Sequence, residues 1–289
     1  MRRKISDAAG GIGGEVCKTL SAANTPFRAM CRKQEQVDRL QTNGMDAVLG
    51  DFDRPETLFA AMTGIATMFL ITPSTPDRFA REVAAIDAAK PAGGGRIVKR
   101  SASDGNVRSQ VLWAQTHALI DQHLRATGIA WTILTPTAFM QNFLWFKDPI
   151  ARGGLPQVAG KGSVSWVDTR DVARIAATVL TEDGHEGPTC FLTGPETLDM
   201  AEATRRLIAV IGHKVRYLNL PTPAFRAILR LTGNSRWIAK GLISQFADVV
   251  AGHHDIDPTF EIERLTDKPP HGFVDFVRDH LRQFAKAAA

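Results

Sequence analysis

Hydrophobic and polar positions follow two alternating patterns along the first half of the chain. Short apolar runs, typical of strands buried in a sheet, are separated by stretches in which apolar residues recur every three to four positions, as on one face of a helix. The pattern predicts strands at 4–6, 27–32, 46–49, 67–71, 96–99 and 131–134, and helices at 13–23, 34–43, 55–62, 78–89 and 110–127. This alternation predicts an α/β fold of the Rossmann type, with a doubly wound, mostly parallel sheet that binds ligands at the carboxyl ends of its strands.

The pattern changes after Pro136. Residues 139–163 are rich in aromatic residues and glycine and are expected to leave the sheet, whereas a helix at 168–180 and a strand at 189–193 are expected to return to it. The remaining pattern predicts one strand at 215–218 and helices at 199–211, 222–231, 235–252 and 272–284. We therefore expect a dinucleotide-binding domain at 1–138 that resumes at about 164–197. A smaller, mainly helical cap domain would comprise 139–163 and 198–289.

Composition narrows the class of protein. With 44% apolar and 22% charged residues, the 289-residue chain is typical of a soluble globular protein. No apolar run approaches the roughly 18 residues of a membrane span, and residues 1–4 lead into no apolar signal core, so we expect a cytoplasmic protein without membrane association. Cys17, Cys31 and Cys190 form no CxxC motif and are expected to be reduced, structural thiols. The net charge of +5 comes from scattered residues and suits an anionic cofactor better than nucleic acid.

A glycine-rich turn joins the first predicted strand to the first helix. Gly10, Gly11, Ile12 and Gly13 lie at this joint, where glycine lets the backbone approach a phosphate and the helix N-terminus directs free N–H groups and its positive dipole end toward it. The Gly-x-x-Gly spacing predicts a dinucleotide site. We interpret Gly160-Lys161-Gly162, which lacks the other residues of a phosphate loop, as unrelated to this site.

The end of the second predicted strand indicates which dinucleotide binds. An NAD site has an acidic residue there, about 20 residues after the turn, to bind the ribose hydroxyls. This chain has Arg32 and Lys33 instead, and a guanidinium suits a 2′-phosphate. The pattern therefore favours NADP(H) over NAD(H).

Several segments resemble the NmrA-like family, a group of atypical short-chain dehydrogenases. That family includes NADPH:quinone reductases of the second type, triphenylmethane-dye reductases and NADP-sensing regulators. Besides the glycine turn, the matching segments are RAMCR at 28–32, GDFD at 50–53, TPS at 72–74, VKRSA at 98–102, LTPTAFMQNF at 134–143, SWVDTRDVA at 165–173 and LTGPE at 192–196. They occur in order over nearly the whole chain. The resemblance implies the Rossmann-type fold and an NADP(H) site.

The resemblance also implies roles for individual residues. Asp51 would accept a hydrogen bond from the adenine edge and Phe52 would stack on the ring, although Asp51 could instead cap the following helix. Ser101 falls where related dehydrogenases have a substrate-orienting serine, and a serine without a chemical role is the alternative. The other cofactor contacts implied by the resemblance are Thr72, Pro73, Ser74 and Thr137.

The predicted helix at 110–127 bears on the mechanism. Members of the broader superfamily carry Tyr-x-x-x-Lys there, but this chain has Trp113 and His117 in that register, and its one tyrosine, Tyr217, lies far away. Loss of a positioned general acid costs about 10²–10⁴ in rate, so we expect an acceptor that needs little proton help, such as a quinone or a cationic dye. His117 is the only local replacement as proton donor, and a structural role in the helix is its alternative.

Five residues are candidates for the wall of a flat apolar pocket that would hold a small aromatic substrate over the nicotinamide. They are Phe139, Met140, Phe143, Trp145 and Trp166, for which ordinary core packing is the alternative. No metal site is expected, because His253-His254-Asp255 lacks further spaced ligands. Homodimerisation remains open.

These patterns lead to two hypotheses. The first is an NADPH-dependent reductase that transfers hydride to a quinone-like or dye-like acceptor. The second is a non-catalytic NADP(H)-sensing protein that binds a regulatory partner. Asp7, where the family usually has the first glycine of the turn, predicts weakened cofactor affinity, since a carboxylate repels a diphosphate. The short, polar first strand would be consistent with such weakening, or with a reading frame that starts elsewhere.

Overall fold

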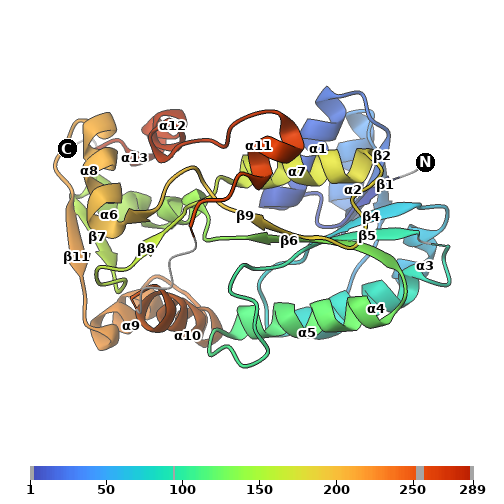
Figure 1. Cartoon of the computed structure of the whole chain (residues 1–289), viewed down its shortest axis with the longest axis horizontal. Coiled ribbons are helices and arrows are strands. Elements are labelled where there is room, and N and C mark those ends of the chain that lie inside the picture. Colours follow the sequence, from blue (N-terminus) through green and yellow to red (C-terminus); the bar gives the residue numbers. More distant parts are fainter. Residues whose placement is uncertain (1–2, 94, 252–256, 287–289) are drawn as a thin grey trace. The chain divides into compact units, whose positions relative to one another are not determined.

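The computed structural model describes residues 3–93, 95–251 and 257–286 (Figure 1). The largest sheet of the described residues has seven strands in the order β3-β2-β1-β4-β5-β6-β9. Its strands are β1 (Arg3–Ile5), β2 (Phe27–Cys31), β3 (Asp46–Leu49), β4 (Thr67–Leu70), β5 (Arg96–Arg100), β6 (Ala130–Pro136) and β9 (Thr189–Leu192). The first six strands in this order are joined by five parallel pairings. The predicted fold class is confirmed.

Helices cover both faces of this sheet. Figure 1 shows α1 and α7 on one face and α4 and α5 on the other, as a doubly wound sheet requires. The helices are α1 (Gly11–Ala22), α2 (Gln34–Thr42), α3 (Glu56–Met62), α4 (Arg78–Ala89), α5 (Leu112–Ala126) and α7 (Thr169–Thr181). The apolar stripes of α3, α4 and α5 meet the strands in one core, where Leu58, Ile86 and Ile120 are fully buried beside Met68 and Ile133. This burial is the main force that holds the sheet and its helices together.

Strand β1 is short and polar, yet it lies at the centre of the sheet between β2 and β4. Its Lys4 is fully buried, and the Nζ atom has no hydrogen-bond partner among the described residues. Burial, together with the nearby charge of Arg28, lowers the pKa of Lys4 from 10.5 to about 7. An ammonium without a partner is expensive to bury, so β1 is held in place by its neighbours in spite of this residue.

The described chain divides into two compact units. One comprises 1–109, 113–136 and 169–191, and the other comprises 110–112, 137–168 and 192–289. The second unit is mostly helical and has two small sheets, β7 with β11 and β8 with β10. Its elements are η1 (Met140–Phe146), α6 (Lys147–Ala151), β7 (Gly154–Gln157), β8 (Ser163–Val164), β10 (Leu198–Asp199), α8 (Met200–Ile211), β11 (Arg216–Asn219), α9 (Thr222–Leu231), α10 (Arg236–Ile243), η2 (Ser244–Val250), α11 (Glu261–Thr266), α12 (Phe273–Asp279) and α13 (Leu281–Phe284).

The predicted elements of this second unit were partly wrong. The single helix expected at 235–252 is α10 followed by the π-helical turn η2, and the helix expected at 272–284 is divided into α12 and α13. The sequence shows no clear helix cap at either of these two divisions, so the apolar pattern alone predicted continuous helices. Within the described part of the chain, no helix is both long and apolar enough to cross a membrane.

Candidate functional site

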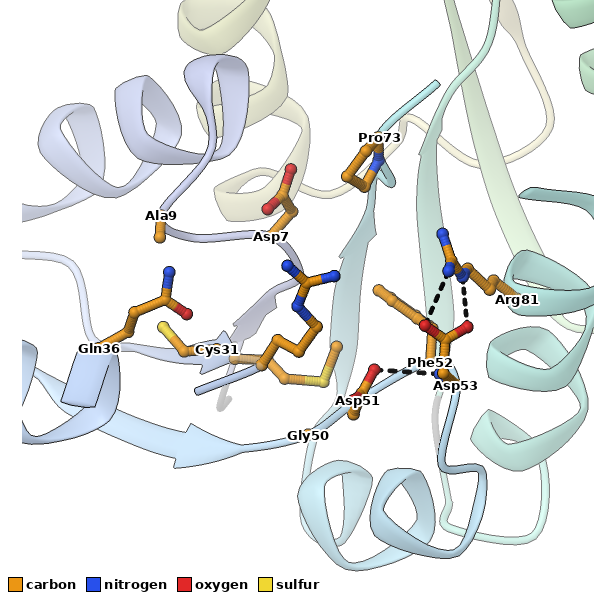
Figure 2. Close-up of a pocket in the computed structure, with 12 residues that line it drawn as sticks. Asp7, Ala9, Cys31, Gln36, Gly50, Asp51, Phe52, Asp53, Pro73 and Arg81 are labelled. Carbon is orange, nitrogen blue, oxygen red and sulfur yellow. Dashed lines mark hydrogen bonds and ion pairs between the residues drawn. The ribbon is translucent and has the colours of Figure 1, made fainter. Parts of the chain in front are cut away.

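A cavity opens at the carboxyl ends of the first four strands. Strand order reverses between β1 and β4, and a crevice at this switch point is the usual ligand site of such sheets. The cavity has a volume of about 100 Å³, and all its lining residues belong to the first compact unit (Figure 2). They are Asp7, Ala9, Met30, Cys31, Arg32, Gln36, Gly50, Asp51, Phe52, Asp53, Pro73 and Arg81.

The glycine turn places the N-terminus of α1 beside this cavity. Gly10 is the N-cap residue, and no side chain among the described residues caps it. A methyl group added at Gly13 would lie 2.3 Å from the carbonyl oxygen of Asp7, whereas one added at Gly11 would meet nothing within 4 Å. Gly13 is therefore needed for the close approach of helix and turn. The N–H groups of the first helical turn lack intrahelical partners and are available to an anion.

Asp7 occupies this turn in an unusual conformation. Its φ of 48° lies in the left-handed region, which costs a non-glycine residue about 1–2 kcal/mol. A methyl group at Gly10 would lie 2.3 Å from Oδ2 of Asp7, so the carboxyl group lies against the N-cap of α1. Burial raises the pKa of Asp7 above its usual value, while the charges of Arg32 and Arg100 act to lower it.

Arg32 lines the cavity as expected for a residue that would bind a 2′-phosphate, and Gln36 of α2 also lines it. Lys33 does not line the cavity. Its side chain is exposed and its Nζ lies 3.6 Å from Glu35. Of the two basic residues proposed for the phosphate, only Arg32 lines this cavity, and its contact with a phosphate stays a prediction.

Asp51 and Phe52 also line the cavity. The alternative for Asp51, capping of α3, does not occur, because the N-cap of that helix is Pro55. Oδ1 of Asp51 instead accepts a hydrogen bond from the backbone N–H of Asp53 at 3.1 Å. The Asp53 carboxylate in turn binds Arg81 of α4 through contacts of 2.5 and 2.7 Å (Figure 2). The pair of Asp53 and Arg81, like Gln36, was not anticipated from the sequence.

Of the TPS segment after β4, only Pro73 reaches the cavity. The Thr72 hydroxyl is buried and donates to Oε1 of Glu82 at 2.6 Å. Arg78 donates to the Ser74 hydroxyl at 2.7 Å. The side chains of Thr72 and Ser74 therefore bind residues of α4, and a role in cofactor binding stays a prediction.

A buried network of charged side chains joins α4, β5 and α5. Nζ of Lys99 lies 2.9 Å from Oδ1 of Asp121 and 3.5 Å from Oε2 of Glu82. All three side chains are almost completely inaccessible to solvent. Each of these charges depends on its partners, because a single charge is costly to bury without an opposite charge beside it.

His117 lies at the centre of this network, and its side chain is completely buried. Nε2 lies 2.8 Å from guanidinium nitrogens of both Arg78 and Arg100. Because a guanidinium can only donate, Nε2 is the acceptor of a neutral imidazole. Burial, reinforced by Lys99, Arg78 and Arg100, holds the pKa of His117 well below 6.5. His117 is therefore uncharged at neutral pH and carries no spare proton for an acceptor.

Ser101 and Thr137 are also tied into hydrogen bonds. The Ser101 hydroxyl is buried and donates to Oδ2 of Asp121 at 2.6 Å. Thr137, in the second unit, donates to the carbonyl oxygen of Ser165 at 2.5 Å. Neither residue lines the cavity at the switch point. Their proposed contacts with substrate and cofactor stay predictions.

The sequence contains signals that indicate the buried network. Lys99 occupies the middle of a strand whose neighbours are buried on both sides, a position that normally takes an apolar residue. Arg78 and Glu82 are four residues apart on α4, and so are His117 and Asp121 on α5, a spacing that places both members of each pair on one helix face. Polar residues at predicted core positions mark such networks.

The aromatic residues predicted to wall a substrate pocket all belong to the second unit, and they fall into two groups. Phe143, Trp145 and Trp166 line a narrow cavity of about 10 Å³. The rings of Phe143 and Trp166 meet edge to face with centroids 5.0 Å apart, and Trp166 stacks on Phe246. Trp145 is 63% exposed, whereas Phe143 and Trp166 are 2% exposed. The backbone of Phe139 forms a parallel β-bridge with that of Val167, and the side chain of Met140 is buried. Neither Phe139 nor Met140 lines this cavity.

No group of three or more potential metal ligands occurs within 3–93, 95–251 and 257–286. The segment His253-His254-Asp255 lies outside the described residues.

Comparisons with known proteins agree with this architecture. The sequence model of the NmrA-like family matches residues 4–269. The chain is 32% identical to the NAD(P)H azoreductase of Xenophilus azovorans over 283 residues, with 96% of this chain and 97% of the relative covered. It is 27% identical to quinone oxidoreductase 2 of Escherichia coli over 253 residues, with 86% of each chain covered.

Solved structures show the same likeness. The NADPH-dependent quinone oxidoreductase of Escherichia coli complexed with NADPH has a TM-score of 0.89 at 25% identity, covering 98% of this chain and 100% of that one. The triphenylmethane reductase of Citrobacter sp. complexed with NADP(H) has a TM-score of 0.85 at 23% identity, covering 97% and 100%. The second similarity concerns the fold alone.

Proposed function

Because the chain belongs to the NmrA-like family, we propose that it is an NADPH-dependent reductase that transfers hydride to a flat aromatic acceptor such as a quinone or a dye. The observation that carries this proposal is Arg32 in the cavity at the switch point of the sheet, next to the open N-terminus of α1. Relatives named as an NAD(P)H azoreductase and a quinone oxidoreductase support the class of acceptor.

The residues around the cavity fit a dinucleotide phosphate. The first turn of α1 would hold the diphosphate through its N–H groups, and Gly11 leaves room for its approach. Arg32 would bind the 2′-phosphate in a charge-assisted contact, and Asp51 and Phe52 would contact the adenine. When bound, the nicotinamide supplies the hydride. The contribution of the chain is to bind and orient the cofactor and to exclude water.

The proposed acceptor accounts for the absence of a tyrosine general acid. The single tyrosine, Tyr217, donates its hydroxyl to the carbonyl oxygen of Gly160, and burial raises its pKa to about 12. His117 is neutral and Ser101 donates to Asp121. We therefore propose that solvent returns the proton. Quinones and cationic dyes tolerate this, because hydride addition gives a stabilised anion or a neutral product.

A steady-state assay tests turnover. Purified protein with NADPH and a panel that includes menadione, an azo dye and a triphenylmethane dye should oxidise NADPH faster than a protein-free control. At saturating NADPH, the rate of reduction of the preferred acceptor should depend little on pH near neutrality, since no side-chain acid is involved. If no member of the panel raises the rate above background, the reductase hypothesis is wrong.

Replacing Arg32 with alanine should weaken NADPH binding by about 10- to 100-fold, because a charge-assisted phosphate contact contributes about 1.5–3 kcal/mol. The affinity for NADH, which lacks the 2′-phosphate, should change by less than about threefold. Titration calorimetry with both cofactors measures this. Arg54→Ala is the matched control, since Arg54 is an exposed arginine close in sequence that does not line the cavity. Equal losses for NADPH and NADH would show that Arg32 does not read the 2′-phosphate.

A non-catalytic NADP(H)-sensing protein is the second candidate. The observation that favours it is that His117 and Ser101, the two side chains proposed for proton transfer and substrate orientation, are both committed to the buried network. In this case NADP⁺ and NADPH should bind with different affinities while no acceptor is reduced. Calorimetry and the turnover assay together separate the two functions.

A further inference from the structure

The carboxyl group of Asp7 lies where an anion would be expected to bind. A methyl group added at Gly10 would lie 2.3 Å from Oδ2 and 3.0 Å from Oδ1 of Asp7, so both oxygens are beside the N-cap of α1. Asp7 also lines the cavity with Ala9 and Pro73, and Figure 2 shows its side chain projecting from the turn after β1. The chain thus places its own carboxylate at the positive end of the helix.

Several charged groups face this carboxyl group. Arg32, after β2, and Arg100, at the end of β5, both act on Asp7 as positive charges. Arg100 is fixed in place because its guanidinium lies 2.8 Å from Nε2 of His117. Burial raises the pKa of the Cys31 thiol and the nearby charge of Asp7 raises it further, so this thiol stays neutral. On the far side of the cavity, Arg81 is paired with Asp53.

The left-handed backbone of Asp7 supports a functional role for this arrangement. A φ of 48° is uncommon for any residue other than glycine, although asparagine and aspartate adopt it more often than other residues do, and residues in such conformations concentrate at ligand sites. Glycine at this position would relieve the strain and remove the charge. The structure keeps both at a position of the turn that lines the cavity.

We propose that Asp7 acts as an internal anion that competes with the cofactor diphosphate for the N-terminus of α1 and for the positive charges of Arg32 and Arg100. This inference rests on the proposed function only in taking a dinucleotide as the ligand. Two negative groups at one helix end repel each other, so the complex forms most readily when Asp7 carries a proton. Binding therefore takes up a proton, and affinity falls as pH rises.

The direction of the pH effect follows from linkage. A diphosphate beside Asp7 favours the protonated carboxyl group, so the pKa of Asp7 is higher in the complex than in the free protein. Between these two pKa values the complex holds more protons than the free protein, and the affinity for the dinucleotide decreases with increasing pH. Burial already raises the pKa of Asp7 in the free protein, which moves this window toward neutrality.

Asp7→Asn tests the proposal directly. Asparagine tolerates positive φ and keeps the shape of the side chain while it removes the charge. NADH and NADPH should both bind about tenfold more tightly to the variant, as expected for the loss of one like charge at close range. Titration calorimetry at about pH 8 gives the affinities, and buffers of different ionisation enthalpy give the proton uptake. Asp7→Gly serves as a second variant that also relieves the backbone strain.

NADH is the decisive ligand, because the 2′-phosphate of NADPH itself titrates near pH 6. The unmodified protein should take up a fraction of a proton on binding NADH and should bind it more tightly at pH 5 than at pH 8. Asp7→Asn should show neither effect. Glu15→Gln is the matched control, since Glu15 is a partly exposed carboxylate on the same helix that pairs with Lys18 away from the cavity.

The outcomes separate this inference from the proposed function. Equal gains for NADH and NADPH, with loss of the proton uptake, support competition at the diphosphate. A gain confined to NADPH would overturn it, because Asp7 would then act only through the 2′-phosphate site at Arg32. Unchanged affinities in both Asp7 variants would also overturn it while leaving cofactor binding intact. If neither the unmodified protein nor Asp7→Asn binds any dinucleotide, the proposed function itself fails.

Discussion

Replacing Lys99 with methionine is expected to lower the free energy of unfolding by about 3–5 kcal/mol, as for other buried ion pairs that lose one partner. Lys99 is fully buried, and its Nζ contacts Asp121 at 2.9 Å and Glu82 at 3.5 Å. Methionine fills similar volume but leaves the two carboxylates without that cation. Denaturant unfolding followed by circular dichroism measures the change. Lys90→Met, at an exposed lysine, should change the stability by less than about 0.5 kcal/mol.

The loss of unfolding free energy caused by Lys99→Met should depend on pH. Burial and three nearby cations hold the pKa of His117 below 6.5 in the folded protein, so the unmodified fold loses stability as pH falls below about 6.5. Without Lys99 one of these cations is gone, and His117 can take up a proton that replaces the missing charge. The difference in unfolding free energy between the variant and the unmodified protein should therefore become smaller as pH falls from about 7 to 5. An equal difference at both values would show that His117 is not coupled to Lys99.

Replacing Lys4 with methionine should have the opposite effect and raise the free energy of unfolding at pH 7, on the order of 2–4 kcal/mol. Lys4 is buried in β1 with no hydrogen-bond partner for Nζ among the described residues, and its pKa is lowered to about 7. The fold therefore has to bury an ammonium or release its proton. Methionine removes this cost while it keeps a similar shape, and Lys18→Met, at an exposed residue of α1, is the control.

The sign of the pH dependence at Lys4 can be tested separately. Between about pH 7 and 10.5 the unfolded chain binds a proton at Lys4 that the folded chain does not, so the stability of the unmodified protein gains from increasing pH. Cys17 and Tyr217, whose pKa values burial raises to about 12, act in the opposite direction at alkaline pH. The difference in unfolding free energy between Lys4→Met and the unmodified protein contains only the contribution of Lys4. This difference should become smaller as pH rises. A constant difference would contradict this account.

The two lysines also show how the same residue type can have opposite consequences. Both lie in central strands and are fully buried. Lys99 meets two carboxylates from the helices on one face, whereas Lys4 meets none within the described structure. A sequence pattern identifies both as polar residues in buried strands, but only the packed structure tells which one has partners.

Local spacing in the sequence determined the alternation of strands and helices, and with it the sheet and its carboxyl edge. It also determined the glycine turn and the position of Arg32. These features depend on residues close together in the sequence and on the order of the strands and helices. For the same reason the breaks in the long C-terminal helices were missed, since no local cap or glycine marks them.

The tertiary structure decided which side chains face each other. His117 and Ser101 were candidates for chemistry on the basis of their register, yet contacts from α4, β5 and α5 place them in a buried network. Asp7 was expected to weaken cofactor binding, but that its carboxyl group lies against Gly10 and faces Arg100 is a matter of three-dimensional packing. Such contacts join residues far apart in the chain, and their charges interact through short distances in space that sequence spacing does not encode.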